Sequence, residues 1–276
     1  MLSNYLIGLR EGLEAALIVG ILVAYVVNTG HRDKLRLVWY GVAAAVGLSL
    51  ALGAVLSFTS ATMGFQAQEA FGGVVSLVAV GCVTWMVFWM KTSAVGIRNE
   101  LHGRLDSALA ATGFTLALLA FVAVAREGLE TALFLFAAVQ ATGQTVTPLV
   151  GAACGLATAV LVGWLVYRGA VKLNLTTFFT WTGAALVVVA AGVFAYGVHD
   201  LQEAEILPGL NVVAWDVSEQ FPPSSWYVSV VRGTLNITPE ETWLQVVAWL
   251  AYLIPVMVLY LRPSHTSSHK EPTQEG

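Results

Sequence analysis

The chain has 276 residues, of which 57% are hydrophobic and only 11% are charged. A soluble domain carries about 25% charged residues, so this chain holds too few charges to cover the surface of a soluble protein. The composition therefore excludes a soluble globular protein and predicts an all-α polytopic membrane protein. The formal net charge of −4 is informative only once the charges are placed along the chain.

Seven apolar stretches approach or exceed the roughly 20 residues that a membrane-spanning helix requires. In chain order they lie near 5–27, 38–58, 70–90, 108–138, 148–167, 177–198 and 242–261. Their polarity does not alternate as it does in the strands of a membrane barrel, so helices are expected. Charges interrupt the first stretch and no small-residue cleavage site follows it, which favours a transmembrane helix over a signal peptide.

Lysine and arginine are distributed unevenly between the connecting loops. Loops 59–69, 139–147 and 199–241 together carry only Arg232. Positively charged loops remain in the cytoplasm, so we expect the N-terminus outside and the C-terminus inside. The opposite set of loops and the tail carry ten basic residues: Arg32, Lys34, Arg36, Lys91, Arg98, Arg104, Arg168, Lys172, Arg262 and Lys270.

The pentapeptide Arg-Glu-Gly-Leu-Glu occurs twice, at residues 10–14 and 126–130, within the first and fourth apolar stretches. An odd number of membrane crossings separates the two copies, so their helices are expected to run in opposite directions. Helices 1–3 and 4–6 are therefore predicted to form an inverted 3+3 repeat with a seventh helix added, as in many transporters. Both copies lie about 13 Å below the outer surface, at ~1.5 Å per residue, so they can face each other.

Each motif combines two glutamates with an arginine and a central glycine. Residues three or four apart share a helix face, so the glutamates point the same way and the arginine reaches the second of them. The glycine allows another helix to approach closely. Facing copies carry a net charge of −2, and carboxylate oxygens select hard cations such as iron(III), magnesium, manganese or calcium. The predicted metal ligands are Glu11, Glu14, Glu127 and Glu130, with Arg10 and Arg126 as charge partners.

Other interpretations of these motifs remain open. A structural clamp between two helices would need only one glutamate per arginine, and the second glutamate favours a ligand role. The ion can also be another hard divalent cation such as manganese. A different class, an integral-membrane enzyme using paired glutamates, lacks HExxH and GxSxG motifs in its helices. Met86 and Met90 flank tryptophan at a helix end and are expected to pack at the membrane interface.

Acidic groups are expected at the outer face, where loop 199–241 carries a single arginine. Such groups concentrate cations at an entrance. Glu240 and Glu241 follow Thr238 and Pro239 and are expected to cap the last helix. The predicted outer ligands are Glu69, which opens the third stretch, and His199, Asp200 and Glu203 at the end of the sixth.

Several longer stretches around the motifs point to a known family. They include LREGLEAALIV at 9–19, TWMVFWM at 84–90, FVAVAREGLE at 121–130, GLATAV at 155–160 and WDVS at 215–218. With its doubled pentapeptide, the chain resembles the oxidase-dependent iron transporter family, which includes the fungal high-affinity iron permeases, and within it the bacterial EfeU-like branch. The letters at Asp216 to Glu219 are similar to the DASE motif of the fungal members.

The resemblance implies a transporter, not an enzyme, that imports iron across the bacterial inner membrane. It implies that the motif glutamates bind and translocate the ion, that iron is the substrate, and that no cofactor is permanently bound. It also implies separate extracytoplasmic partners, an iron-binding protein and a haem peroxidase or oxidase.

The expected organisation is one transmembrane permease domain at 1–262. Its parts are a first repeat at about 1–106, a second at about 107–200, the outer acidic loop 199–241 and helix seven at 242–261. The tail at 263–276 is expected to be disordered in the cytoplasm.

Overall fold

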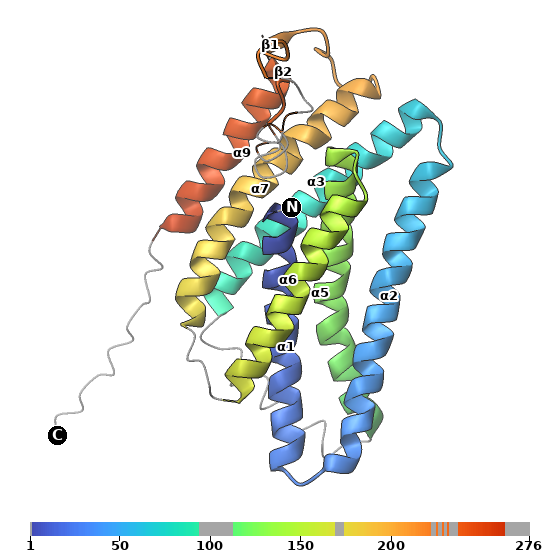
Figure 1. Ribbon diagram of the computed structural model, residues 1–276, viewed down its shortest axis with the longest axis vertical. Helices are drawn as coiled ribbons and strands as arrows, with labels where there is room; N and C mark the ends of the chain where they lie inside the picture. The colour runs from blue at the N-terminus through green and yellow to red at the C-terminus, as the bar shows by residue number, and fades with distance from the viewer. Residues whose placement is uncertain are drawn as a thin grey trace, which may run out of the picture.

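The computed structural model describes residues 2–93, 113–168, 174–221, 225, 228, 231 and 237–262. Within these residues, seven long helices run roughly along the long axis of the molecule (Figure 1). They are α1 (Leu2–Asn28), α2 (Leu35–Ala61), α3 (Phe65–Ser93), α5 (Gly113–Thr142), α6 (Val146–Tyr167), α7 (Leu175–Glu203) and α9 (Trp243–Leu261). The predicted all-α class is confirmed, and each of the seven apolar stretches contributes one of these helices. The predicted tail lies outside the described residues.

Five of the helices, α2, α3, α6, α7 and α9, are long and apolar enough to cross a membrane. The other two, α1 and α5, are equally long but each carries the three charges of one motif. The large apolar side chains exposed along the bundle fit a lipid surround rather than water. The chain is therefore a multi-pass membrane protein.

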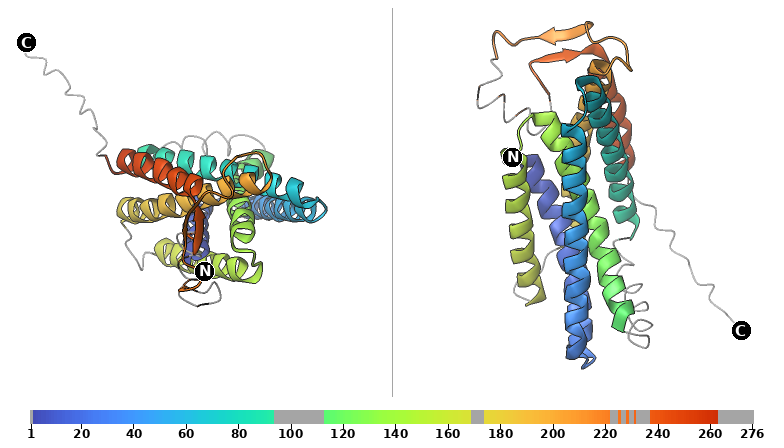
Figure 2. Two further views of the ribbon diagram at one scale, coloured as in Figure 1. Left: turned by 90° about the horizontal axis from the view of Figure 1, so that it is seen from above. Right: turned by 90° about the vertical axis from the view of Figure 1, so that its right-hand side faces the viewer.

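Two short strands, which the sequence analysis did not predict, lie at one end of the bundle (Figure 2). Strand β1 (Val213–Asp216) pairs antiparallel with β2 (Glu240–Thr242). We call this the strand end of the molecule; α3 begins near it and α7 ends near it (Figure 1). A short 3-10 helix, η1 (Arg32–Lys34), precedes α2.

The prediction that Glu240 and Glu241 cap the last helix is wrong. Glu240 and Glu241 belong to β2, where pairing holds their backbone extended. Thr242 is the N-cap instead: its hydroxyl accepts from the Gln245 backbone N–H at 3.3 Å, and the Gln245 side-chain oxygen accepts from the Thr242 N–H at 2.8 Å. This reciprocal capping box satisfies two backbone donors that the first turn of a helix leaves free.

Six of the long helices pack in three main pairs. The most extensive packing is between α1 and α6, between α2 and α5, and between α3 and α7, with α9 added against α7. Glycines permit the close approaches. A Cβ at Gly155 of α6 would lie 2.6 Å from the Leu9 backbone nitrogen of α1, and one at Gly128 would overlap Ser49 of α2. With these faces occupied, α1 and α5 turn their motif glutamates toward each other.

A first prediction concerns this packing. Gly155→Ala should lower the melting temperature of the protein in detergent by several degrees, because the added methyl meets backbone atoms that cannot move aside and overpacking costs about 1–3 kcal/mol. Gly20→Ala, on a face of α1 with nothing within 4 Å, is the matched control and should not lower the melting temperature. Equal melting temperatures for the two variants would contradict the α1–α6 packing.

Candidate metal site

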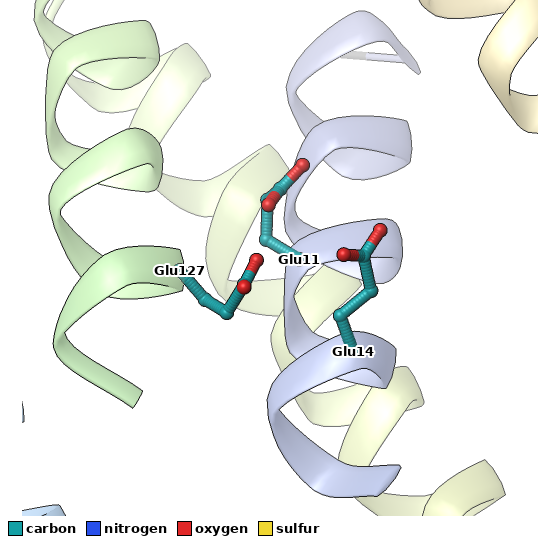
Figure 3. A group of neighbouring side chains, drawn as sticks. All are labelled: Glu11, Glu14 and Glu127. Carbon is teal, nitrogen blue, oxygen red and sulfur yellow. The ribbon is translucent and has the colours of Figure 1, made fainter. Parts of the chain in front are cut away.

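The two motifs meet between α1 and α5. Single carboxylate oxygens of Glu11, Glu14 and Glu127 all lie within 4.8 Å of one another. Figure 3 shows Glu127 extending from α5 toward α1, where the carboxylates of Glu11 and Glu14 lie. All three side chains are buried. One ion between the helices can therefore be reached by three carboxylates.

Several polar atoms of this group lack hydrogen-bond partners. Among the residues that the structure describes, both carboxylate oxygens of Glu11 and one oxygen of Glu127 are buried with no partner. One oxygen of Glu130 and the Nη1 of Arg10 are in the same situation. An unpaired buried carboxylate is costly, and a cation with oxygen ligands removes that cost. The donor set fits a hard cation such as iron or manganese.

Each motif arginine pairs with the second glutamate of its own motif, as the spacing predicted. Arg10 Nε donates to Glu14 Oε1 at 3.1 Å, and Arg126 Nε donates to Glu130 Oε1 at 3.2 Å. Glu130 is held by this ion pair and lies outside the group of three carboxylates. With all three carboxylates ionised and Arg10 as the counter-charge, that group carries an excess of two negative charges, which matches a divalent cation.

The two arginines have different surroundings, although their motifs are identical. The Arg10 side chain is 1% exposed, and its Nη2 donates to the Met90 sulfur at 3.0 Å. The Arg126 side chain is 31% exposed, and its guanidinium lies over the rings of Trp85 and Trp89 at 4.9 and 4.4 Å. Cation–π contacts of this kind stabilise a charge in an apolar setting.

The three α3 residues that contact the arginines lie in the last turns of this helix, and the sequence analysis missed their role. The expectation that Met86 and Met90 pack at the membrane interface is wrong, because both are buried in the core. The four-residue spacing of the two tryptophans and of the two methionines places each pair on one face of a helix. Nothing in the sequence shows that these faces meet α1 and α5.

A second group of carboxylates lies toward the strand end. Oxygens of Glu69 on α3 and of Asp200 and Glu203 on α7 lie within 4.8 Å of one another. Asp200 is buried, and its Oδ1 has no partner among the described residues, whereas the other two are partly exposed. A Cβ at Gly72 would lie 3.0 Å from Asp200 Oδ2, so the glycine leaves room for this carboxylate.

His199 does not belong to the second group of carboxylates, but it contacts one member of it. Its Nε2 lies 3.5 Å from Glu203 Oε1, one helical turn along α7. The end of α7 is fixed by Gln202, which is buried. Gln202 donates to the Pro208 carbonyl at 3.0 Å and accepts from the Thr242 hydroxyl at 3.0 Å. These bonds tie the end of α7, which carries two carboxylates of the second group, to the start of α9.

The DASE-like letters form a local turn. Asp216 Oδ1 accepts from the Ser218 backbone N–H at 3.0 Å and from the Ser218 hydroxyl. These hydrogen bonds stabilise the ionised carboxylate and hold the pKa of Asp216 below its ordinary value. The side chain is exposed and belongs to neither carboxylate group.

Membrane-length helices packed around buried carboxylates define a multi-pass membrane transporter. Comparison with known proteins identifies the family. The model of the iron permease FTR1 family matches residues 1–264. The ferrous iron permease EfeU of Escherichia coli O157:H7 is 38% identical over 266 residues, covering 95% of this chain and 96% of the relative. The EfeU of Yersinia pestis is 36% identical over 271 residues, covering 97% and 96%.

The chain therefore belongs to the iron permease FTR1 family. The predicted resemblance and the assignment as a transporter rather than an enzyme are confirmed. No solved structure matches the chain.

A second prediction follows from the unequal surroundings of the arginines. Arg10→Gln should lower the free energy of unfolding in detergent by about 3–5 kcal/mol, because it leaves Glu14 charged and unpaired in a buried position. Arg126→Gln should cost clearly less, since this arginine is partly exposed. The double variant Arg10→Gln/Glu14→Gln should recover much of the loss. Equal losses for the two arginine variants would contradict the different environments.

Proposed function

We propose that this protein imports iron across the bacterial inner membrane and that the ion binds between α1 and α5, on Glu11, Glu14 and Glu127. The observation that carries the proposal is the group of three buried carboxylates with unpartnered oxygens, contributed by two different helices. Glu130 supports the site through Arg126 and can become a fourth ligand if their ion pair opens. The net charge of −2 around Arg10 and the names of the relatives favour ferrous iron as the cargo.

The proposed topology has seven membrane-spanning helices, with the N-terminus outside and the C-terminus in the cytoplasm. Helices α1–α3 and α5–α7 are proposed to be repeats of opposite direction. Exchanging them maps the α1–α6 contact onto the α5–α2 contact and leaves the α1–α5 and α3–α7 contacts in place, which supports this assignment. In this topology the strand end is the outer face.

The second carboxylate group is proposed as the outer station where iron is first collected. Glu69 and Glu203 are partly exposed and can meet a hydrated ion, whereas Asp200 is buried beneath them. His199 contacts Glu203 and is placed to hold it in position. Two groups of negative charge at different depths would raise the local cation concentration and then draw the ion inward.

Release of the ion into the cytoplasm requires the carboxylates between α1 and α5 to bind it less tightly. The two repeats are proposed to rock against each other about this site, as inverted repeats permit. Coupling to a separate extracytoplasmic iron-binding protein and a haem peroxidase or oxidase is also proposed, and it rests on the resemblance alone.

A third prediction tests the inner site. Glu11→Gln and Glu127→Gln should each reduce uptake of radiolabelled iron(II) by at least about tenfold, because each removes one charged ligand. Uptake would be measured in cells lacking other iron importers, at matched membrane expression and with manganese as competitor. Glu219→Gln, at an exposed position near β1, is the matched control and should transport normally. Normal uptake by both motif variants would reduce the motifs to a helix clamp.

A fourth prediction tests the outer station. Asp200→Asn should raise the KM for iron while changing the maximal rate much less, because the station collects the ion before the inner site acts on it. Glu240→Gln, an exposed carboxylate on β2, is the control and should leave KM unchanged. A lowered maximal rate with unchanged KM would argue against a collecting role.

A further inference from the structure

A cavity of about 40 Å³ lies between α1, α3, α5 and α7. Its walls are mostly apolar, but α1 contributes two buried polar side chains, Ser3 and Asn4. A cavity of this size has room for a few water molecules, and water needs polar partners to remain there. Neither residue belongs to the carboxylate groups described above.

The cavity lies on the same helix faces as the inner carboxylates. On α1, Asn4, Ile7 and Glu11 follow one another at spacings of three and four residues, so they form one stripe. On α5, Phe134 and Ala138 of the wall continue the stripe that begins at Glu127. The cavity is therefore separated from the carboxylates by about one turn of α1, from Ile7 to Glu11, and by about two turns of α5, from Phe134 to Glu127. Ile7 and Phe134 are both buried.

Two residues of the cavity wall lie on the helices that carry the outer carboxylate group. Val193 of its wall lies on α7, seven residues, or about 10 Å, before Asp200. Val80 of its wall lies on α3, eleven residues after Glu69, again on the same face. The cavity thus occupies the interval between the two groups of carboxylates.

Asn4 is the side chain in this interval best suited to a cation. Its amide carbonyl is a hard oxygen ligand without charge. Asn4 is buried and lines the cavity. Thr142, at the other end of the cavity, donates its hydroxyl proton to the Ala138 carbonyl at 2.7 Å, so the proton is directed away from an ion.

We propose that the cavity is an intermediate iron site, in which the Asn4 side-chain oxygen and retained water hold the ion between the outer carboxylates and Glu11. The site rests on the proposed function, since it has a role only if iron passes from one carboxylate group to the other. A neutral ligand suits such a position, because it binds the ion without holding it as strongly as the carboxylates on either side.

Kinetics of iron(II) uptake in proteoliposomes test the proposal. Asn4→Leu, similar in shape but without a ligand atom, should raise KM about tenfold, equivalent to ~1.4 kcal/mol. Asn4→Asp keeps an oxygen ligand and should not raise the KM, because the loss of a ligand is avoided. Asn28→Leu, at the exposed opposite end of α1, is the matched control and should behave as wild type. A wild-type KM for Asn4→Leu would overturn the proposal.

A second measurement decides the matter if Asn4→Leu does not fold. In a Cys82→Ala/Cys154→Ala background, an impermeant thiol reagent applied from outside should modify the Ala138→Cys variant, which lines the cavity and keeps Asn4, and iron(II) should slow that modification. The same protection is expected when Glu127→Gln has abolished transport. Modification at an unchanged rate with iron(II) present would overturn the intermediate site.

The two proposals fail in different ways. If Glu11→Gln and Glu127→Gln transport normally, the inner site is wrong and the intermediate site falls with it. If those variants lose transport while Asn4→Leu keeps a wild-type KM, only the intermediate site is wrong.

Discussion

Burial of excess negative charge between α1 and α5 is the constraint on which the rest of the structure depends. A charge at mid-membrane depth costs about 2.5–3.5 kcal/mol even on lenient insertion scales. In the proposed topology Glu11, Glu14 and Glu127 face this cost together, with Arg10 as the nearest compensation. Their helices are screened by close-packed neighbours, α6 against α1 and α2 against α5, which approach over glycine. The tight packing of α6 and α2 thus permits charged groups without a full set of hydrogen-bond partners to lie between α1 and α5.

The helices and the meeting of the motifs could be predicted from the sequence, because both follow from local rules. Apolar length gives the helices, and the three- and four-residue spacing gives the shared face and the Arg10–Glu14 and Arg126–Glu130 pairs. The opposite direction of two identical motifs follows from counting crossings. Grouping Glu69 with Asp200 required only that both lie at ends of helices on the same side.

Features that depend on long-range packing could not be predicted. The sulfur of Met90 and the rings of Trp85 and Trp89 look like ordinary apolar residues until α3 is placed beside α1 and α5. The cavity at Asn4 depends on four helices at once. The strand pair depends on a contact between two segments that are far apart in the sequence. Because this pairing takes up Glu240 and Glu241, Thr242 caps the last helix in place of the expected carboxylates.

The end of α3 explains how two identical motifs become unequal. It contacts both arginines: Met90 on one face accepts from Arg10, and the two tryptophans on another face lie beneath Arg126. Helix α9, which has no counterpart in the proposed repeats, packs beside α3 through the Tyr252 hydroxyl, 2.6 Å from the Thr84 hydroxyl. A shift of α3 would therefore alter both guanidinium environments at once, and with them the positions of the charges that balance the carboxylates. The segment 84–90 would thus link helix movement to the strength with which the proposed inner site holds its ion.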